Sequence, residues 1–117
     1  MNKRWIYHLS RRHDRQIAKD LRSYAGSVED ASDGFLHFST TSQVVESAHK
    51  HRAGEQNLVL LEVDAHSLGV SLKWEPSRGG ELFPHLYEPL QVNAVSAEFK
   101  LSLGCDGLHV FPELKTE

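Results

Sequence analysis

At residues 33–40 the chain reads Asp33-Gly34-Phe35-Leu36-His37-Phe38-Ser39-Thr40, an apolar segment of strand-like composition with a histidine near its centre. A second segment, Phe83-Pro84-His85-Leu86-Tyr87, has the same character. A neutral imidazole inside a strand needs partners for its ring nitrogens, and an unsatisfied buried polar group costs roughly 1–3 kcal/mol. Two such histidines in one small chain indicate a site, although each can also be a core residue with a backbone partner.

The segments around these two predict an α+β fold. We expect strands at 5–9, 57–63, 70–75, 92–101 and 108–111, and at 83–87 only an edge or broken strand, because Pro84 has no N–H to donate. Residues 57–63 read as a strand buried on both faces. Helices are expected at 11–22, capped by Ser10, and from the Thr40–Gln43 capping box to residue 52, with a turn at 26–34. The prediction is six or seven short strands with two helices near the N-terminus.

Length and charge narrow the class of protein. The 117 residues predict a single domain spanning 1–117, and a net charge of −3 gives no reason to expect non-specific nucleic-acid binding. The longest apolar run, at 58–61, is far shorter than the roughly 20 residues of a membrane-spanning helix. A lone Cys105 and an N-terminus without a signal-like apolar stretch predict a cytoplasmic protein.

Four side chains are candidates for chemistry: His8, His37, Glu75 and His85, each in or beside a predicted strand. They could ligate a metal, but their spacing contains no His-x-His or His-x-x-x-His pair, so no metal is expected. No glycine-rich loop of the Rossmann or P-loop type occurs. A nucleotide would therefore have to be held in another way.

Three segments and the opening Ile6-Tyr7-His8 resemble the signatures of the DUF952 family: residues 33–40, 58–64 and 73–87. The resemblance covers about residues 5 to 100. It implies a split β-sheet core like that of the ADP-ribosyltransferase superfamily, which binds NAD in a cleft between two sheets. It also implies catalytic positions: His8 resembles the first, His37 the second, and either Glu75 or His85 the third.

The same resemblance implies a nucleotide as ligand and NAD as the cofactor. The residues expected to contact it are Ser39, Arg78, Gly79 and Tyr87. Arg78 precedes two glycines, so its guanidinium could approach a phosphate bidentately. Glu88 stands where the family usually has glycine, and it would repel pyrophosphate if it faced the cleft.

Two functions follow as hypotheses. The first is an enzyme acting on NAD by ADP-ribosyl transfer or glycohydrolysis, in which preorganised groups stabilise an oxocarbenium-like cation as nicotinamide leaves. The second is a non-catalytic ligand-binding or protein-interaction module of the same fold, because a fold does not determine a function. A metal-dependent enzyme is a third hypothesis.

Overall fold

The strand Leu58–Asp64 (β5) lies at the centre of the main sheet, and six of its seven residues are buried, five of them apolar. It pairs with β1 (Trp5–Arg11) over seven antiparallel positions, from Trp5↔Asp64 to Arg11↔Leu58. On its other side it pairs with β9 (Val95–Leu103), with a register shift at Glu62 and Val63. The prediction of a strand buried on both faces is confirmed.

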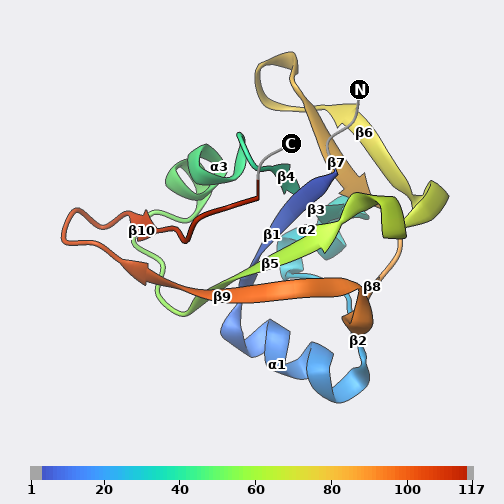
Figure 1. The fold of residues 1–117 in the computed structure, drawn as a ribbon, viewed down its shortest axis with the longest axis horizontal. Coiled ribbons are helices and arrows are strands. Elements are labelled where there is room, and N and C mark those ends of the chain that lie inside the picture. Colours follow the sequence, from blue (N-terminus) through green and yellow to red (C-terminus); the bar gives the residue numbers. More distant parts are fainter. Residues whose placement is uncertain (1–3, 116–117) are drawn as a thin grey trace.

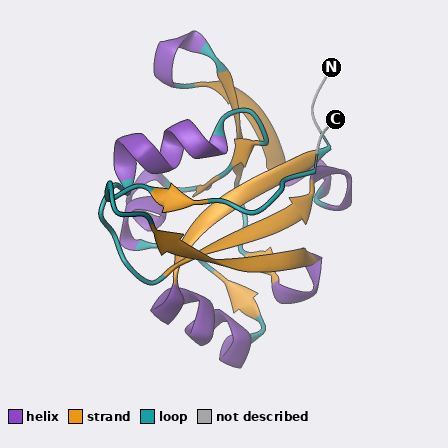
Figure 2. Cartoon of the chain, turned by 60° about the vertical axis from the view of Figure 1, so that its left-hand side comes forward, coloured by secondary structure: helices purple, strands orange, loops and turns teal. Residues whose placement is uncertain are grey.

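The computed structural model describes residues 4–115 and has an α+β architecture, as predicted (Figures 1 and 2). The main sheet has the order β10-β9-β5-β1-β4, a second sheet the order β3-β7-β6, and a third is the pair β2-β8. The remaining strands are β2 (Ser23–Tyr24), β3 (Leu36–His37), β4 (Ser39–Thr40), β6 (Leu72–Pro76), β7 (Leu82–Leu86), β8 (Leu90–Gln91) and β10 (His109–Val110). Within residues 4–115 there are thus ten strands rather than six or seven, because five of them have only two residues.

Three α-helices are present in the described residues, not two: α1 (Arg12–Leu21), α2 (Val28–Asp33) and α3 (Val44–His51). Helix α2 occupies the segment predicted as a turn. Its cause is a capping box, in which Ser27 accepts from the N–H of Asp30 while the Asp30 carboxylate accepts from the N–H of Ser27. Ser10 does not cap α1, so that prediction is wrong. Of the predicted Thr40–Gln43 capping box one half is present, because the Gln43 side chain accepts from the Thr40 N–H over 2.9 Å, but the N-cap residue of α3 is Gln43 and not Thr40.

The strand at 82–86 is also not an edge strand. It is the middle strand of the second sheet, between β3 and β6. Pro84 is tolerated there because it pairs with Trp74 of β6 but lies just beyond the two residues that pair with β3. In Figure 1 the β6–β7 hairpin stands apart from the long strands β1, β5 and β9.

Two hydrophobic clusters cover the two faces of the main sheet. Consecutive residues of β1 point to opposite faces, so Ile6 belongs to the cluster with Leu61, and Tyr7 to the cluster with Leu60. The second cluster is completed by Val44 of α3. No helix in the described part of the chain is long and apolar enough to cross a membrane.

Candidate functional site

A cavity opens where the main sheet and the second sheet separate. Leu36 and His37 pair with β7, Ser39 and Thr40 reach the main sheet, and Phe38 between them passes from one sheet to the other. The Phe38 N–H donates to the Pro84 carbonyl over 3.0 Å. The cavity has a volume of about 450 Å³, and His8, His37 and His85 all line it. The structure therefore brings three of the four predicted catalytic residues to one place.

His8 lies at the floor of this cavity and is only 2% exposed. Its Nδ1 is 2.6 Å from the His37 carbonyl, and its Nε2 is 2.7 Å from the Tyr24 hydroxyl. The carbonyl can only accept, so Nδ1 carries the proton and the Tyr24 hydroxyl donates to Nε2. Burial lowers the pKa of His8, and a neutral ring fits both bonds. His8 links β1 to β2 and β3.

His37 is held by carboxylates at both ring nitrogens. Its Nδ1 is 2.5 Å from Asp30 Oδ1, and its Nε2 is 2.8 Å from Asp33 Oδ2. The hydrogen bond to Asp30 raises the pKa of His37, so the imidazolium form is favoured. Its side chain is 41% exposed. Since both ring edges are occupied, the accessible part of His37 includes its ring face.

Asp30 anchors this arrangement from α2. Its side chain is 4% exposed, and it accepts hydrogen bonds from the backbone and the side chain of both Ser27 and His37. Burial, the largest single effect, opposes ionisation, but the hydrogen bond from the His37 side chain and the other favourable contacts, including the backbone N–H bonds of Ser27 and His37, together outweigh it and hold the pKa of Asp30 well below its usual range. The cap of a short helix and the orientation of a cavity histidine thus depend on one carboxylate.

His85 forms a second carboxylate–histidine pair. Its Nδ1 is 2.8 Å from Glu75 Oε1, which also accepts from the Tyr87 hydroxyl over 2.6 Å. These hydrogen bonds, from Tyr87 first and then from His85, lower the pKa of Glu75. The pairing places the proton of a neutral His85 on Nδ1 and leaves its Nε2 lone pair without a hydrogen-bond partner among residues 4–115. Nε2 is therefore available to a ligand.

Phe35 joins the two pairs. Its ring stacks on His85 with centroids 4.1 Å apart and contacts His37 at 4.6 Å, while the two histidine rings lie 5.8 Å apart. Packing against an aromatic ring restricts the rotamers of both histidines. The site is therefore preorganised by three carboxylates, of Asp30, Asp33 and Glu75, and by one aromatic side chain.

Of the residues predicted to contact a nucleotide, some line the cavity and others do not. Ser39 lines the cavity, and its hydroxyl lies 3.1 Å from that of Ser47. Tyr87 and Gly79 are exposed and are not among the lining residues. The Arg78 side chain lies outside the described part of the structure. Glu75 acts through His85 and not by lining the cavity itself.

The lining residues that the sequence analysis did not propose include four charged side chains: Glu29, Asp30, Asp33 and Arg52. The Ser27-x-x-Asp30 spacing is a capping signal that would have predicted α2 and buried Asp30. Nothing in the sequence indicated Arg52, which comes directly after the last residue of α3.

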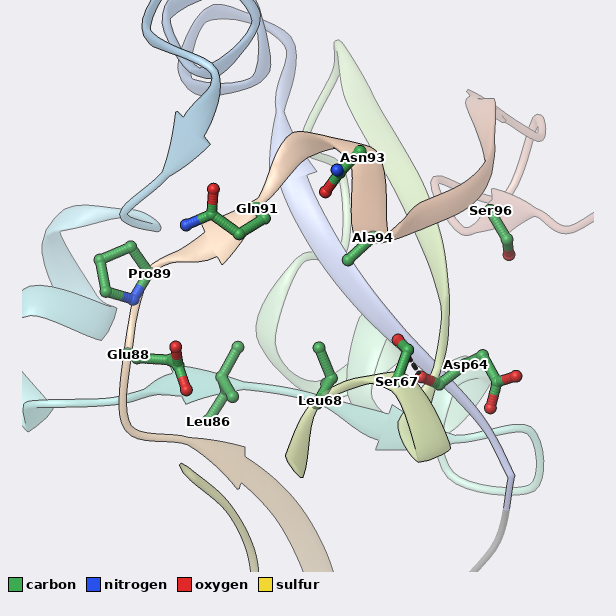
Figure 3. A pocket seen from close by; sticks show the side chains of 10 residues that line it. All are labelled: Asp64, Ser67, Leu68, Leu86, Glu88, Pro89, Gln91, Asn93, Ala94 and Ser96. Atoms are coloured by element: carbon green, nitrogen blue, oxygen red, sulfur yellow. Dashed lines mark hydrogen bonds between the residues drawn. The ribbon is translucent and has the colours of Figure 1, made fainter. Parts of the chain in front are cut away.

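Glu88 does not face this cavity. It lies in a separate hollow of about 410 Å³, together with Leu86, Pro89 and Gln91 (Figure 3). The expected repulsion of a pyrophosphate in the cleft therefore does not apply to Glu88. No group of three or more histidine, cysteine or acidic side chains within the described residues is arranged to hold a metal ion.

Comparison with known proteins identifies relatives but no reaction. Residues 9–98 match the family described as "Protein of unknown function (DUF952)". The crystal structure of protein CC0527 from Caulobacter crescentus is 46% identical, with a TM-score of 0.88 over 91% of this chain and 93% of that one. The solution NMR structure of CC0527 is 47% identical, with a TM-score of 0.80 over 89% and 90%. No curated protein matches the chain.

Proposed function

This chain belongs to the DUF952 family, and we propose that its cavity binds NAD or an ADP-ribose-like nucleotide and promotes the loss of nicotinamide. The observation that carries the proposal is the pair of carboxylate-held histidines, His37 and His85, on one cavity wall where two sheets separate. A volume of about 450 Å³ is within the usual range of small-molecule sites, about 300–1,000 Å³. A split between sheets is also where the ADP-ribosyltransferase-like fold implied by the sequence would hold NAD.

The electrostatics of the wall suit the nicotinamide end. Asp30 and Asp33 are two carboxylates around the single imidazolium of His37, so this wall carries a net negative charge. The nicotinamide ring of NAD is cationic, and the ribose carbon becomes cationic as the ring leaves. Both charges are stabilised by a preorganised negative wall. Phe38 and Phe83 supply apolar surface beside it.

In the proposed reaction the bond between ribose C1′ and the nicotinamide nitrogen breaks, and its electron pair neutralises the pyridinium. Water, or the hydroxyl of an acceptor, then forms a bond to C1′. Its proton passes to Nε2 of His85, the ring atom with no internal partner among the described residues. Glu75 keeps His85 in the correct tautomer and stabilises the imidazolium that forms. His8 has a positioning role, because both of its ring nitrogens are bonded within the protein.

The second candidate is a nucleotide-binding module without catalysis. It is favoured by the number of polar atoms that are already used internally: both ring nitrogens of His8, both of His37, and Oε1 of Glu75. Of the ring nitrogens of His8, His37 and His85, only Nε2 of His85 is then left for a proton transfer, and a binder requires none.

The test is an amide NMR titration with NAD, followed by an assay for free nicotinamide. If the proposal is correct, shifts cluster around His37 and His85, and His85→Asn lowers nicotinamide release by roughly a hundredfold or more while NAD still binds. His66→Asn is the matched control, because His66 lies on the 3-10 helix Ala65–Ser67 and does not line the cavity. Clustered shifts with intact NAD after long incubation would support the binding module, and no shifts at millimolar NAD would reject both candidates.

A further inference from the structure

We propose that Arg52 and Arg11 form a phosphate subsite at the mouth of the cavity, and that the carboxylate of Glu29 occupies this subsite in the structure. The inference rests on the proposed function and deepens it, because it locates the pyrophosphate of the nucleotide. Arg52 and Glu29 both line the cavity that holds His37 and His85. The subsite and the histidines therefore share one continuous space.

The geometry around Glu29 is that of an anion held by two guanidinium groups. Its Oε1 lies 2.9 Å from Arg11 Nη2 and 3.6 Å from Arg52 Nη1. One oxygen shared by two arginines is an arrangement that suits a phosphate group, because a phosphate carries more negative charge than a carboxylate and its oxygen can bond to both guanidinium groups. Glu29 thus marks a position that a stronger anion would take.

Glu55 holds the two arginines in place from the other side. Its Oε1 lies 2.8 Å from Arg11 Nε, and its Oε2 lies 3.3 Å from Arg52 Nη1. The Glu55 side chain is 27% exposed, whereas that of Glu29 is 53% exposed. Displacing Glu29 therefore leaves the arginines oriented, and an ion pair at such an exposed position contributes little to stability.

The charge balance changes in the required direction when Glu29 is displaced. Two arginines against Glu55 alone have a net positive charge, which an incoming phosphate neutralises. Burial is the main cause of the lowered pKa of His8, and the charge of Arg52 lowers it further. The electrostatic field of Arg52 therefore reaches His8 at the cavity floor, which is expected of a group that positions a ligand in this cavity.

Calorimetric titration with inorganic pyrophosphate tests the subsite without a nucleotide. We expect Glu29→Gln to bind pyrophosphate about three- to fivefold more tightly, because a competing carboxylate is removed. Arg52→Gln should bind it at least about tenfold more weakly, because a charge-assisted contact is lost. The control is Glu46→Gln on α3, whose carboxylate pairs with Lys50 and is 63% exposed, and it should bind as the wild type does.

Pyrophosphate affinity that is unchanged in Glu29→Gln, or undetectable at millimolar concentration in both proteins, overturns the subsite. Glu29 is exposed, so this variant keeps the test valid even if Arg52→Gln is poorly folded. Nicotinamide riboside, which has no phosphate, separates the two proposals. Riboside shifts at His37 and His85 without pyrophosphate binding reject the subsite alone. Pyrophosphate binding as expected, with no response to riboside or NAD, supports the subsite and rejects the proposed function.

Discussion

Replacing Asp30 by asparagine removes the charge from a carboxylate that accepts four hydrogen bonds. Oδ2 accepts from the N–H of Ser27 at 2.8 Å and from its hydroxyl at 2.9 Å. Oδ1 accepts from the N–H of His37 at 3.0 Å and from its Nδ1 at 2.5 Å. An asparagine has one oxygen and one NH₂ group in these two places. Whichever way its amide is oriented, the NH₂ group faces a backbone N–H, that of Ser27 or that of His37, which can only donate, and the side-chain partner on the same side has to reorient in order to accept.

The magnitude follows from these contacts. A buried donor without an acceptor costs about 1–3 kcal/mol, and Asp30 has a side chain that is only 4% exposed. With one backbone N–H left without an acceptor and the charge-assisted bond to His37 lost, we expect Asp30→Asn to lower the free energy of unfolding by about 2–4 kcal/mol. This is a large share of the roughly 5–15 kcal/mol of a typical domain. Urea unfolding at pH 7, followed by far-ultraviolet circular dichroism, measures it.

Asp33→Asn is the matched control for this experiment. Asp33 also faces His37, at 2.8 Å from its Nε2, but its side chain is 54% exposed. An exposed ion pair contributes about 0–1 kcal/mol, so Asp33→Asn should change stability by no more than that. If Asp30→Asn costs less than about 1 kcal/mol, or no more than Asp33→Asn, the assignment of Asp30 as the anchor of α2 and of the site is refuted.

Three further outcomes are expected in urea unfolding. Tyr24→Phe leaves Nε2 of His8 as a buried acceptor without a donor, and should cost about 1–3 kcal/mol. Gly26→Ala should cost about 2 kcal/mol or more, because φ is +86° and a Cβ would lie 2.7 Å from the Cβ of Asp30. The pKa of His37 is raised from 6.5, so the contribution of its charged form to stability is present below pH 6.5 and is lost as pH rises through the folded-state pKa. The pKa of Asp30 is lowered from 3.8, so the contribution of its carboxylate is present above pH 3.8 and is lost as pH falls through the folded-state pKa. The lowered pKa of His8 acts in the opposite sense below pH 6.5, so the contribution of the His37–Asp30 pair is measured as the difference in urea midpoint between the wild type and His37→Asn. This difference should be greatest between about pH 4 and 6.5, and a difference that does not vary with pH would contradict the assignment.

Residue composition was sufficient to predict the central strands. The segment 57–63 has apolar residues at consecutive positions, and only a strand with both faces covered accommodates that pattern. The two-residue strands were harder to predict from the sequence, because a strand such as Leu36–His37 is defined by its pairing with β7 and not by its own composition. The same holds for β7, which Pro84 made appear to be an edge.

The pairing of Glu75 with His85 shows how far the candidate site could be predicted from the sequence. Both residues were candidates from the sequence, and the sequence left open which of them is used. In the β6–β7 hairpin, Lys73 is opposite His85 and Glu75 is opposite Phe83, so Glu75 and His85 are diagonal neighbours across the two strands. Long side chains can meet at a diagonal position, and here they form one hydrogen-bonded unit.

The sequence by itself determined the α+β class, the family and the presence of histidines within strands, because composition and motifs are local properties of the chain. Only the tertiary structure decided which ring nitrogens are occupied, that Asp30 holds His37, and that Glu29 lies between Arg11 and Arg52. These contacts join separate elements. Their existence depends on strand register and on distances of a few tenths of an ångström, which the order of residues does not specify.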